Sequence, residues 1–174
     1  TRLRDRDGIA VGRPAVVQCE LSIGIDCAGV REISFTYRYL CQHRSTRTGS
    51  AIVPIPGGDK LGIRPLDRLF DCFQQMGIST QITENQIKFN VNKIKPVHYT
   101  FNKPSHTVTE TVIMVAVFAD GQTILNNAAQ EPEIDDLILM LNSMGAKINR
   151  HPQDSKQIII DGVTSLSGTK HQVI

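Results

Sequence analysis

The sequence predicts an α/β fold in which one strand–helix–strand–strand unit occurs twice. The residues from Leu66 to Gly77 align with those from Ile134 to Gly145, each position lying 68 residues before its counterpart. In both copies apolar residues recur at helical spacing, which predicts a helix with one buried face. Segments that alternate in polarity flank both helices, as expected of strands in a half-buried sheet. The repeat therefore predicts two similar α/β units along the chain.

The first unit is expected to begin with a strand at Ala51 to Ile55 and to continue into the helix at Leu66 to Gly77. A pair of strands follows, Ser79 to Ile82 and Gln86 to Val91, joined by a polar turn. Gly77 comes directly after the last apolar position of the helix, where a residue in the left-handed conformation forms a favourable C-terminal cap.

The second unit repeats this order. Its expected elements are a strand at Thr123 to Asn126, the helix at Ile134 to Gly145, and strands at Lys147 to Arg150 and Gln157 to Asp161. A further helix, Thr107 to Phe118, precedes this unit. The two units together predict a mixed α/β domain.

Residues 1–48 differ in composition from the rest of the chain. Residues 1 to 49 contain eight Arg and no Lys, whereas residues 50 to 174 contain three Arg and eight Lys. Only Ala15 to Ile23 is expected to form an element there, and the first unit's counterpart of the further helix would fall near Phe35 to Arg47, where no apolar stripe exists. We therefore expect an atypical segment at 1–48 and a partial domain at 49–174. Two interpretations stay open: a divergent, solvated basic segment, or a stretch that is not native coding sequence, such as a reading-frame error.

Composition excludes several classes of protein. A chain of 174 residues that is 40% hydrophobic can bury one compact core. A net charge of +2 and the absence of Trp leave neither a basic surface nor a stacking surface for nucleic acid. The longest apolar stretch, Val112 to Phe118, is far shorter than the roughly 20 residues that cross a bilayer. The four cysteines form no C-x-x-C pair, which argues against a zinc site or a disulfide framework. We expect a cytoplasmic protein that binds no metal, nucleic acid or membrane.

The start of the helix near residue 107 is a candidate anion-binding site. Thr107 and Glu110 have the spacing of a capping box, so the helix is expected to begin after Thr107 as its N-cap. The free N–H groups of a helix start favour an anion, and Lys103 and Ser105 lie just upstream with a positive charge and a hydroxyl. Capped helices with a nearby Lys are common, so a purely structural role stays open.

A glycine-rich loop from Pro54 to Asp67 leads into the first predicted helix, with Pro65 in its first turn. The loop contains Asp59, Lys60 and Arg64 within six residues, a combination suited to gripping a phosphorylated substrate while an acid transfers a proton. A surface turn with solvated charges is the alternative, because the spacing matches neither the P-loop nor the dinucleotide fingerprint.

Four blocks of this sequence resemble one known family. They are P-G-G-D-K-L-G-I-R-P-L-D (Pro56 to Asp67), K-P-S-H-T-V-T-E (Lys103 to Glu110), N-N-A-A-Q-E-P-E-I-D-D-L (Asn126 to Leu137) and L-N-S-M-G-A-K-I, which ends at Ile148. In order and content they resemble the UDP-N-acetylglucosamine 1-carboxyvinyltransferases, the enolpyruvyl transferases of cell-wall synthesis. The resemblance implies an inside-out, barrel-like α/β domain with helices inside and sheets outside, present here in incomplete form.

The resemblance also implies an activity. The family transfers the enolpyruvyl group of phosphoenolpyruvate to the 3-hydroxyl of the sugar in UDP-N-acetylglucosamine, the first committed step of peptidoglycan synthesis, and needs no cofactor. Its active site lies between two domains, so this chain alone is expected to be inactive. A non-catalytic UDP-sugar-binding or interaction module is the alternative. The shikimate-pathway branch of the superfamily is disfavoured by the P-G-G-D and A-A-Q-E-P-E blocks.

The resemblance implies roles for particular residues. Asp59 falls where most members have a cysteine that acts as general acid, and Arg64 falls on an arginine that contacts the substrate phosphate. The segment that lines the uridine site corresponds to Arg64, Pro65, Leu66, Asp67 and Arg68. The second nucleotide-binding segment corresponds to Lys103, Pro104, Ser105 and His106. The family usually has S-V-G-A-T-E where this chain has S-H-T-V-T-E, so His106 is either a substrate contact or a helix-start residue.

Overall fold

A computed structural model describes residues 16–19, 50–54, 67–84 and 86–173. In chain order its elements are β1 (Val16–Cys19), β2 (Ser50–Pro54), α3 (Asp67–Gln75), β3 (Ser79–Ile82), β4 (Gln86–Asn90), β5 (His98–Thr100), α4 (His106–Ala116), β6 (Gln122–Asn126), α5 (Pro132–Ser143), β7 (Lys147–His151), β8 (Asp154–Asp161) and β9 (Thr169–Gln172). The strands form a three-stranded sheet in the order β2-β4-β3, a four-stranded sheet in the order β5-β6-β8-β7, and a separate β1-β9 ribbon. None of the helices described is long and apolar enough to span a membrane.

The predicted repeat is confirmed by the way the strands pair. In the first unit β4 lies between β2 and β3 and is antiparallel to both. In the second unit β8 lies between β6 and β7 and is again antiparallel to both. The predicted helices and strands of both units are all present, and their bounds differ from the predictions by no more than a few residues. The two units therefore share topology as well as sequence pattern.

Both repeat helices end in the same capping motif. The positive φ angles of Gly77 (80°) and Gly145 (104°) place both glycines where the sequence predicted a C-terminal cap. After Gly77, the Ile78 N–H donates to the Phe73 carbonyl, and after Gly145 the Ala146 N–H donates to the Leu141 carbonyl. These bonds satisfy carbonyls that the helix end would otherwise leave without a partner.

Two strands were not predicted. β5 has only three residues and pairs in parallel with β6, so its pattern is too short to recognise. β9 is polar throughout and pairs with β1, which lies inside the predicted Ala15 to Ile23 element. Both strands depend on a partner distant in sequence, which local periodicity does not reveal.

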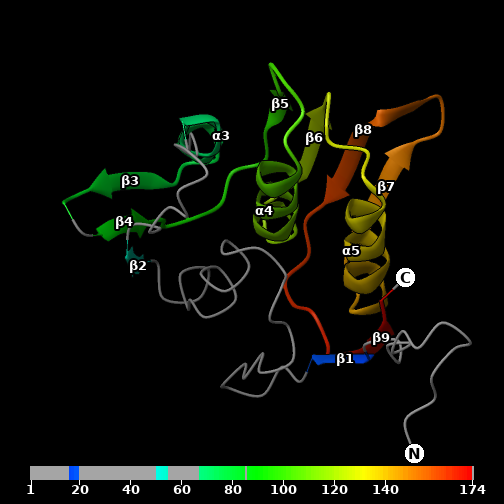
Figure 1. Ribbon diagram of the computed structural model, residues 1–174. Helices are drawn as coiled ribbons and strands as arrows, with labels where there is room; N and C mark the ends of the chain where they lie inside the picture. Colours follow the sequence, from blue (N-terminus) through cyan, green and yellow to red (C-terminus); the bar gives the residue numbers. More distant parts are fainter. Residues whose placement is uncertain (1–15, 20–49, 55–66, 85, 174) are drawn as a thin grey trace, which may run out of the picture.

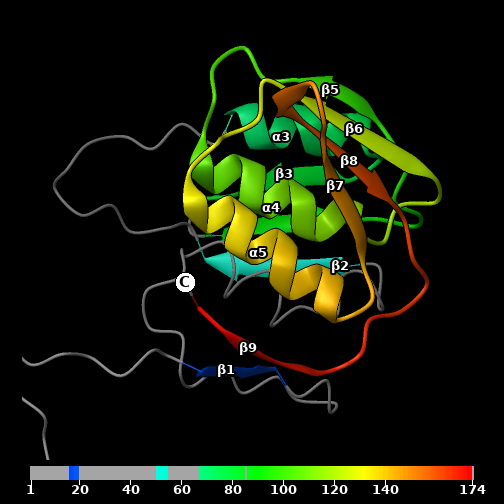
Figure 2. The same cartoon turned by 90° about the vertical axis from the view of Figure 1, so that its right-hand side faces the viewer.

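The helices lie inside and the sheets outside, as the resemblance implied. Residues on all sides of α4 are buried, from Val108 to Ala116 with Met114 half-buried, so α4 is the central helix. α3 and α5 pack on either side of it, and the four-stranded sheet covers α4 and α5 (Figures 1 and 2). The three-stranded sheet packs on α3 through Phe89, whose ring centroid lies 5.8 Å from that of Phe73. Closure into a barrel stays a prediction.

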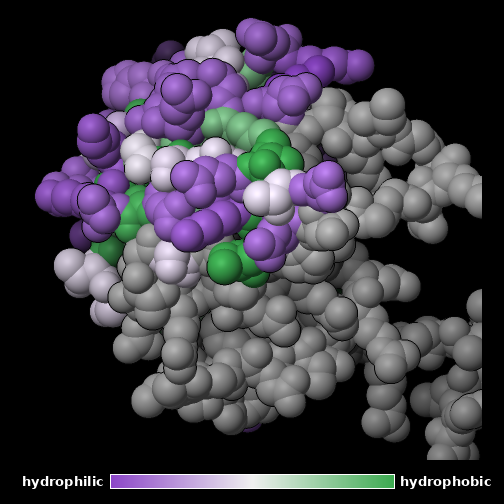
Figure 3. Space-filling view, turned by 90° about the vertical axis from the view of Figure 1, so that its left-hand side faces the viewer, coloured by the Kyte–Doolittle hydropathy of each residue, from purple (hydrophilic) through white to green (hydrophobic). Residues whose placement is uncertain are grey.

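The three-stranded sheet presents a largely polar outer face. Figure 3 shows this side of the molecule, where hydrophilic residues surround a few hydrophobic ones. By register, Ile52, Lys88 and Gln81 form one cross-strand row on the outer face. Ile52 is half exposed there, as single apolar side chains on protein surfaces commonly are.

Candidate functional site

The helix start that was predicted to bind an anion differs in detail from the prediction. α4 begins at His106 and its N-cap is Ser105, which has extended backbone angles, so the prediction of Thr107 as N-cap is wrong. The Thr109 N–H already donates to the Ser105 carbonyl at 2.9 Å, which places Thr107 inside the first turn. The Ser105 side chain makes no cap hydrogen bond, and the capping box with Glu110 does not form. In the described part of the chain no side-chain cap occupies the N–H groups of the first turn, so these groups can bind a ligand.

The first turn of α3 lies beside this helix start. The Arg68 guanidinium Nη1 donates to the Lys103 carbonyl at 3.4 Å, across 35 residues of sequence. The hydroxyl of Tyr99, on β5, donates to the Asp71 carboxylate at 2.8 Å and lies 3.4 Å from the Arg68 carbonyl oxygen. Two segments that the resemblance assigned to one nucleotide site are therefore neighbours in space.

The predicted site residues fall into two groups. Asp67, Lys103 and Pro104 are exposed, and Arg68, Ser105 and His106 are half-buried, so the structure brings these six to one end of the helices. The remaining four lie outside the described residues and stay predictions: Asp59, Arg64, Pro65 and Leu66.

A buried acid below the helix start was not predicted. The Glu110 side chain is 9% exposed, and its Oε1 lies 3.3 Å from Nε2 of His106, one turn earlier in α4. The distance fits an ion pair, but the contact is not a hydrogen bond, and the buried Nε2 has no hydrogen-bond partner among the described residues. Burial raises the pKa of the Glu110 carboxyl, His106 opposes that shift, and Glu133 and Glu131 add to it. The His-x-x-x-Glu spacing was visible in the sequence, but the capping-box prediction had already assigned Glu110 another role.

The segment between β6 and α5 holds the first turn of α4 from the other side. The Asn127 amide donates to the Phe101 carbonyl at 2.8 Å, and the Ala129 N–H donates to Thr109 Oγ1 at 3.2 Å. Asn127 has a positive φ of 54°, which a short polar residue tolerates better than most. This segment lies within the N-N-A-A-Q-E-P-E block, so that block supports the helix start.

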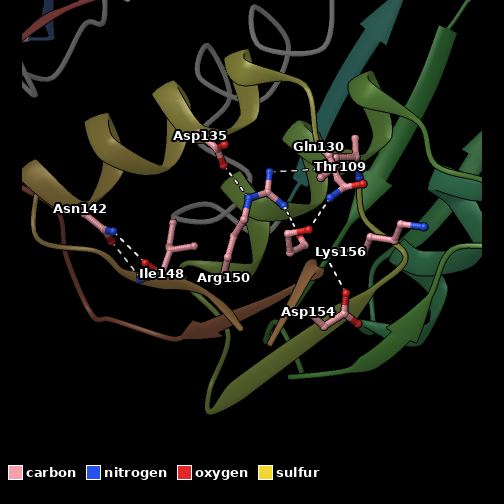
Figure 4. A network of polar contacts seen from close by, with 10 residues as sticks. Thr109, Gln130, Asp135, Asn142, Ile148, Arg150, Asp154 and Lys156 are labelled. Carbon is pink, nitrogen blue, oxygen red and sulfur yellow. Dashed lines mark hydrogen bonds and ion pairs between the residues drawn. The ribbon is translucent and has the colours of Figure 1, made fainter. Parts of the chain in front are cut away.

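Arg150 forms the centre of a second polar network that fixes the same segment (Figure 4). Its guanidinium contacts the Asp135 carboxylate at 2.5 Å, the Ser155 carbonyl at 2.7 Å and the Ala129 carbonyl at 3.1 Å. The Arg150 side chain is only 17% exposed. The network links β7, the start of α5, the first residues of β8 and the segment before α5, so its role is to position the segment that packs on α4.

This arrangement suits an anionic ligand. Arg68 and Lys103 supply positive charge, the first turn of α4 supplies N–H donors, and His106 supplies a titratable ring at the same place. Within residues 16–19, 50–54, 67–84 and 86–173, no group of His, Cys, Asp and Glu side chains is arranged to hold a metal ion.

Known proteins resemble this chain over most of its length. The family model described as EPSP synthase (3-phosphoshikimate 1-carboxyvinyltransferase) matches residues 32–174. The UDP-N-acetylglucosamine 1-carboxyvinyltransferase of Prochlorococcus marinus strain MIT 9312 is 44% identical over 133 residues, 74% of this chain and 29% of that protein. The enzyme of the same name from Prochlorococcus marinus strain NATL1A is 36% identical over 166 residues, 88% of this chain and 36% of its own. The chain thus spans about a third of the length of these curated relatives.

Solved structures show the same fold. The enolpyruvyl transferase NikO from Streptomyces tendae superimposes with a TM-score of 0.56 at 18% identity, over 71% of this chain and 29% of that one. EPSP synthase from Acinetobacter baumannii superimposes with a TM-score of 0.58 at 20% identity, over 78% and 30% of the two chains. With the family match over residues 32–174, these findings establish that the chain belongs to the EPSP synthase family of enolpyruvyl (1-carboxyvinyl) transferases.

Proposed function

We propose that the protein containing this chain transfers the enolpyruvyl group of phosphoenolpyruvate to UDP-N-acetylglucosamine, in the cytoplasm and as a step of peptidoglycan synthesis. The curated relatives at 35–44% identity have names that state this substrate and this transfer. Residues 49–174 are the partial transferase domain, and residues 1–48 are an atypical segment whose boundary the family match, beginning at residue 32, does not fix.

The proposed mechanism divides the work between two segments. Asp59 protonates phosphoenolpyruvate, and Arg64 binds its phosphate. Two segments bind the UDP-sugar. One consists of Pro65, Leu66, Asp67 and Arg68 and runs in sequence into α3, and the other consists of Lys103, Pro104, Ser105 and His106 at the start of α4. A carboxylic acid can act as the proton donor when its surroundings keep it protonated.

The contact between Arg68 and the Lys103 carbonyl is the observation that supports this proposal most directly. The diphosphate of a UDP-sugar needs several hydrogen-bond donors close together. The two segments supply cationic side chains and helix-start N–H groups side by side. The enolpyruvyl transfer itself requires groups from a second domain, since half a cleft can neither exclude water nor orient two substrates. This chain alone is therefore proposed to bind nucleotide without turnover.

Calorimetry with the 174-residue chain tests the binding half of the proposal. UDP-N-acetylglucosamine should bind and shikimate 3-phosphate should not. Arg68→Ala and Lys103→Ala should each weaken binding by about tenfold, the effect expected when one charge-assisted contact is lost. Lys147→Ala, an exposed cation on β7, is the matched control and should bind as the unmodified chain does. Preferential binding of shikimate 3-phosphate would instead place the chain in the other branch of the family.

A non-catalytic UDP-sugar-binding module is the second candidate function. It is distinguished by adding a second transferase domain, taken from one of the relatives, and measuring phosphate release from phosphoenolpyruvate and UDP-N-acetylglucosamine. Release that depends on both polypeptides supports the enzyme. Tight binding by this chain with no release in the mixture supports the module.

A further inference from the structure

His106 and Glu110 form an acid–base pair directly beneath the α4 start. Nε2 of His106 and Oε1 of Glu110 lie 3.3 Å apart, and the Glu110 side chain is 9% exposed against 37% for His106. The histidine is therefore the outer member of the pair, at the first position of α4, and the glutamate is the inner member. Of the two side chains, only His106 has enough exposed surface to contact a ligand bound at the helix start, while its Nε2 is turned inward and buried.

The charges that act on Glu110 are mainly negative. Glu131 and Glu133, at the start of α5, act on Glu110 and disfavour its ionised form. On the outer side, Lys103 lies three residues before His106, and Arg68 of α3 reaches the Lys103 carbonyl. The helix α3 and the strand β8 also pack on α4. In the described part of the chain, none of their charged side chains is among those that shift the pKa of Glu110.

A carboxylate as buried as Glu110 has to be neutralised by a proton or by a cation. The pair can meet this need with one proton in either of two arrangements: a protonated acid beside a neutral ring, or a carboxylate beside an imidazolium. Both arrangements have zero net charge, and the proton belongs to the pair rather than to one residue. When the proton is lost, an uncompensated negative charge remains one helical turn below the anion-binding end of α4.

We propose that the His106–Glu110 pair is a one-proton element of the nucleotide site: anions bind to the helix start when the pair holds its proton and are repelled when it does not. His106 faces the ligand, and Glu110 is a positioning residue that acts through His106. The inference rests on the proposed function, since it assigns a charge requirement to the same site.

Linkage fixes the sign of the effect. If an anion binds better to the protonated pair, then binding must raise the affinity of the pair for its proton by the same factor. UDP-N-acetylglucosamine suits the test, because its phosphates are diesters that stay ionised throughout the range in which Glu and His titrate. Its affinity should therefore fall as pH rises from about 5.5 to about 8.5, a range that lies above the ordinary pKa of a glutamate and includes that of a histidine.

The experiment is a calorimetric titration of the chain with UDP-N-acetylglucosamine across that range. Unmodified protein should lose about fivefold or more in affinity, as expected for one unit charge appearing a helical turn from the ligand. Glu110→Gln keeps the shape of the side chain but removes the carboxylate that stabilises the shared proton. Only the His106 ring can then exchange a proton, so the midpoint of the affinity profile should move to lower pH. Glu84→Gln removes an exposed carboxylate at the β3–β4 turn and should keep the wild-type profile.

A second measurement needs no variant. Titrations of the unmodified chain in buffers with different ionisation enthalpies give the number of protons taken up on binding, which should be positive near the middle of the profile. Zero uptake, or a Glu110→Gln chain with the wild-type pH profile, would overturn the inference and leave the proposed function standing. Absence of UDP-N-acetylglucosamine binding at every pH would overturn the proposed function itself.

Discussion

The Tyr99 hydroxyl donates a 2.8 Å hydrogen bond to the Asp71 carboxylate and so links β5 to α3 across 28 residues of sequence. Burial, the hydrogen bond to Asp71 and the Asp71 charge raise the pKa of the Tyr99 phenol, so it stays a donor into the alkaline range. The strand that carries Tyr99 leads directly to Lys103, and the helix that carries Asp71 begins beside Arg68. The bond therefore fixes the relative position of the two segments proposed to bind nucleotide.

Replacing Tyr99 by Phe should lower the free energy of unfolding by about 1 kcal/mol, measured by urea titration. The Tyr99→Phe chain keeps the packing of the ring on Phe101, and the exposed Asp71 carboxylate can bind water instead. Asp71→Asn is the matched control, since its amide oxygen still accepts the bond, and it should lose less. Equal stability of Tyr99→Phe and the unmodified chain would mean that the bond contributes nothing.

Arg150→Ala should destabilise the chain by about 2 kcal/mol, because it leaves the buried Ala129 carbonyl and the Ser155 carbonyl without their donor. Lys147→Ala, an exposed side chain on the same strand, should change stability by less than about 0.5 kcal/mol. Amide hydrogen exchange should show faster opening of the segment after β6 in Arg150→Ala alone. Similar exchange in both variants would argue against a positioning role for Arg150.

Replacement by alanine should destabilise the chain to different extents at two glycines. A Cβ on Gly162 would lie 1.7 Å from the Ala119 carbonyl oxygen, so Gly162→Ala forces the backbone apart and should cost about 3 kcal/mol or more. Gly145 has open space around it but a φ of +104°, so Gly145→Ala should cost only about 1–2 kcal/mol of backbone strain. Thermal unfolding of both variants gives the ranking, and the reverse order would contradict this account.

Cys72 should make stability fall at alkaline pH. Burial and the Asp71 charge raise the pKa of its thiol from 9.0 to about 12. The folded state thus holds this proton more tightly than the unfolded state, so the contribution is complete below pH 9.0 and is lost as pH rises toward about 12. Urea titrations should show a loss on the order of 1–2 kcal/mol by about pH 10.5, reduced in Cys72→Ala. The same burial predicts that a thiol reagent labels the Cys72 peptide only after unfolding.

The protein that contains this chain should resist fosfomycin, which alkylates the loop cysteine in the family that this sequence resembles. Asp59 has a carboxylate in place of that thiol, and Asp59→Cys should restore sensitivity. Inhibition is measured as phosphate release after preincubation with the drug, and a mass shift locates the adduct. An adduct on the Asp59 loop of the unmodified enzyme would contradict the role assigned to Asp59.

Local sequence pattern was enough for the repeat, because the apolar stripes and cap glycines of α3 and α5 are properties of neighbouring residues. It was insufficient where long-range pairing decides the structure, as in β5 and the polar β9. Two hydroxyl residues near the start of α4, Ser105 and Thr107, could each serve as the N-cap. The capping-box spacing predicted Thr107, but Ser105 is the last residue with extended backbone angles before the helix. Burial of Glu110 follows from the packing of α5 and the segment before it, which no spacing within α4 reveals.

The equivalent strand order in the two units has a consequence for engineering. Positions that match at the 68-residue offset occupy the same place in two related cores, as Phe73 and Leu141 do, or Met76 and Met144. Each repeat unit thus serves as an internal reference for the other. A core side chain that one unit accepts is a candidate substitution at the matching position of the other unit.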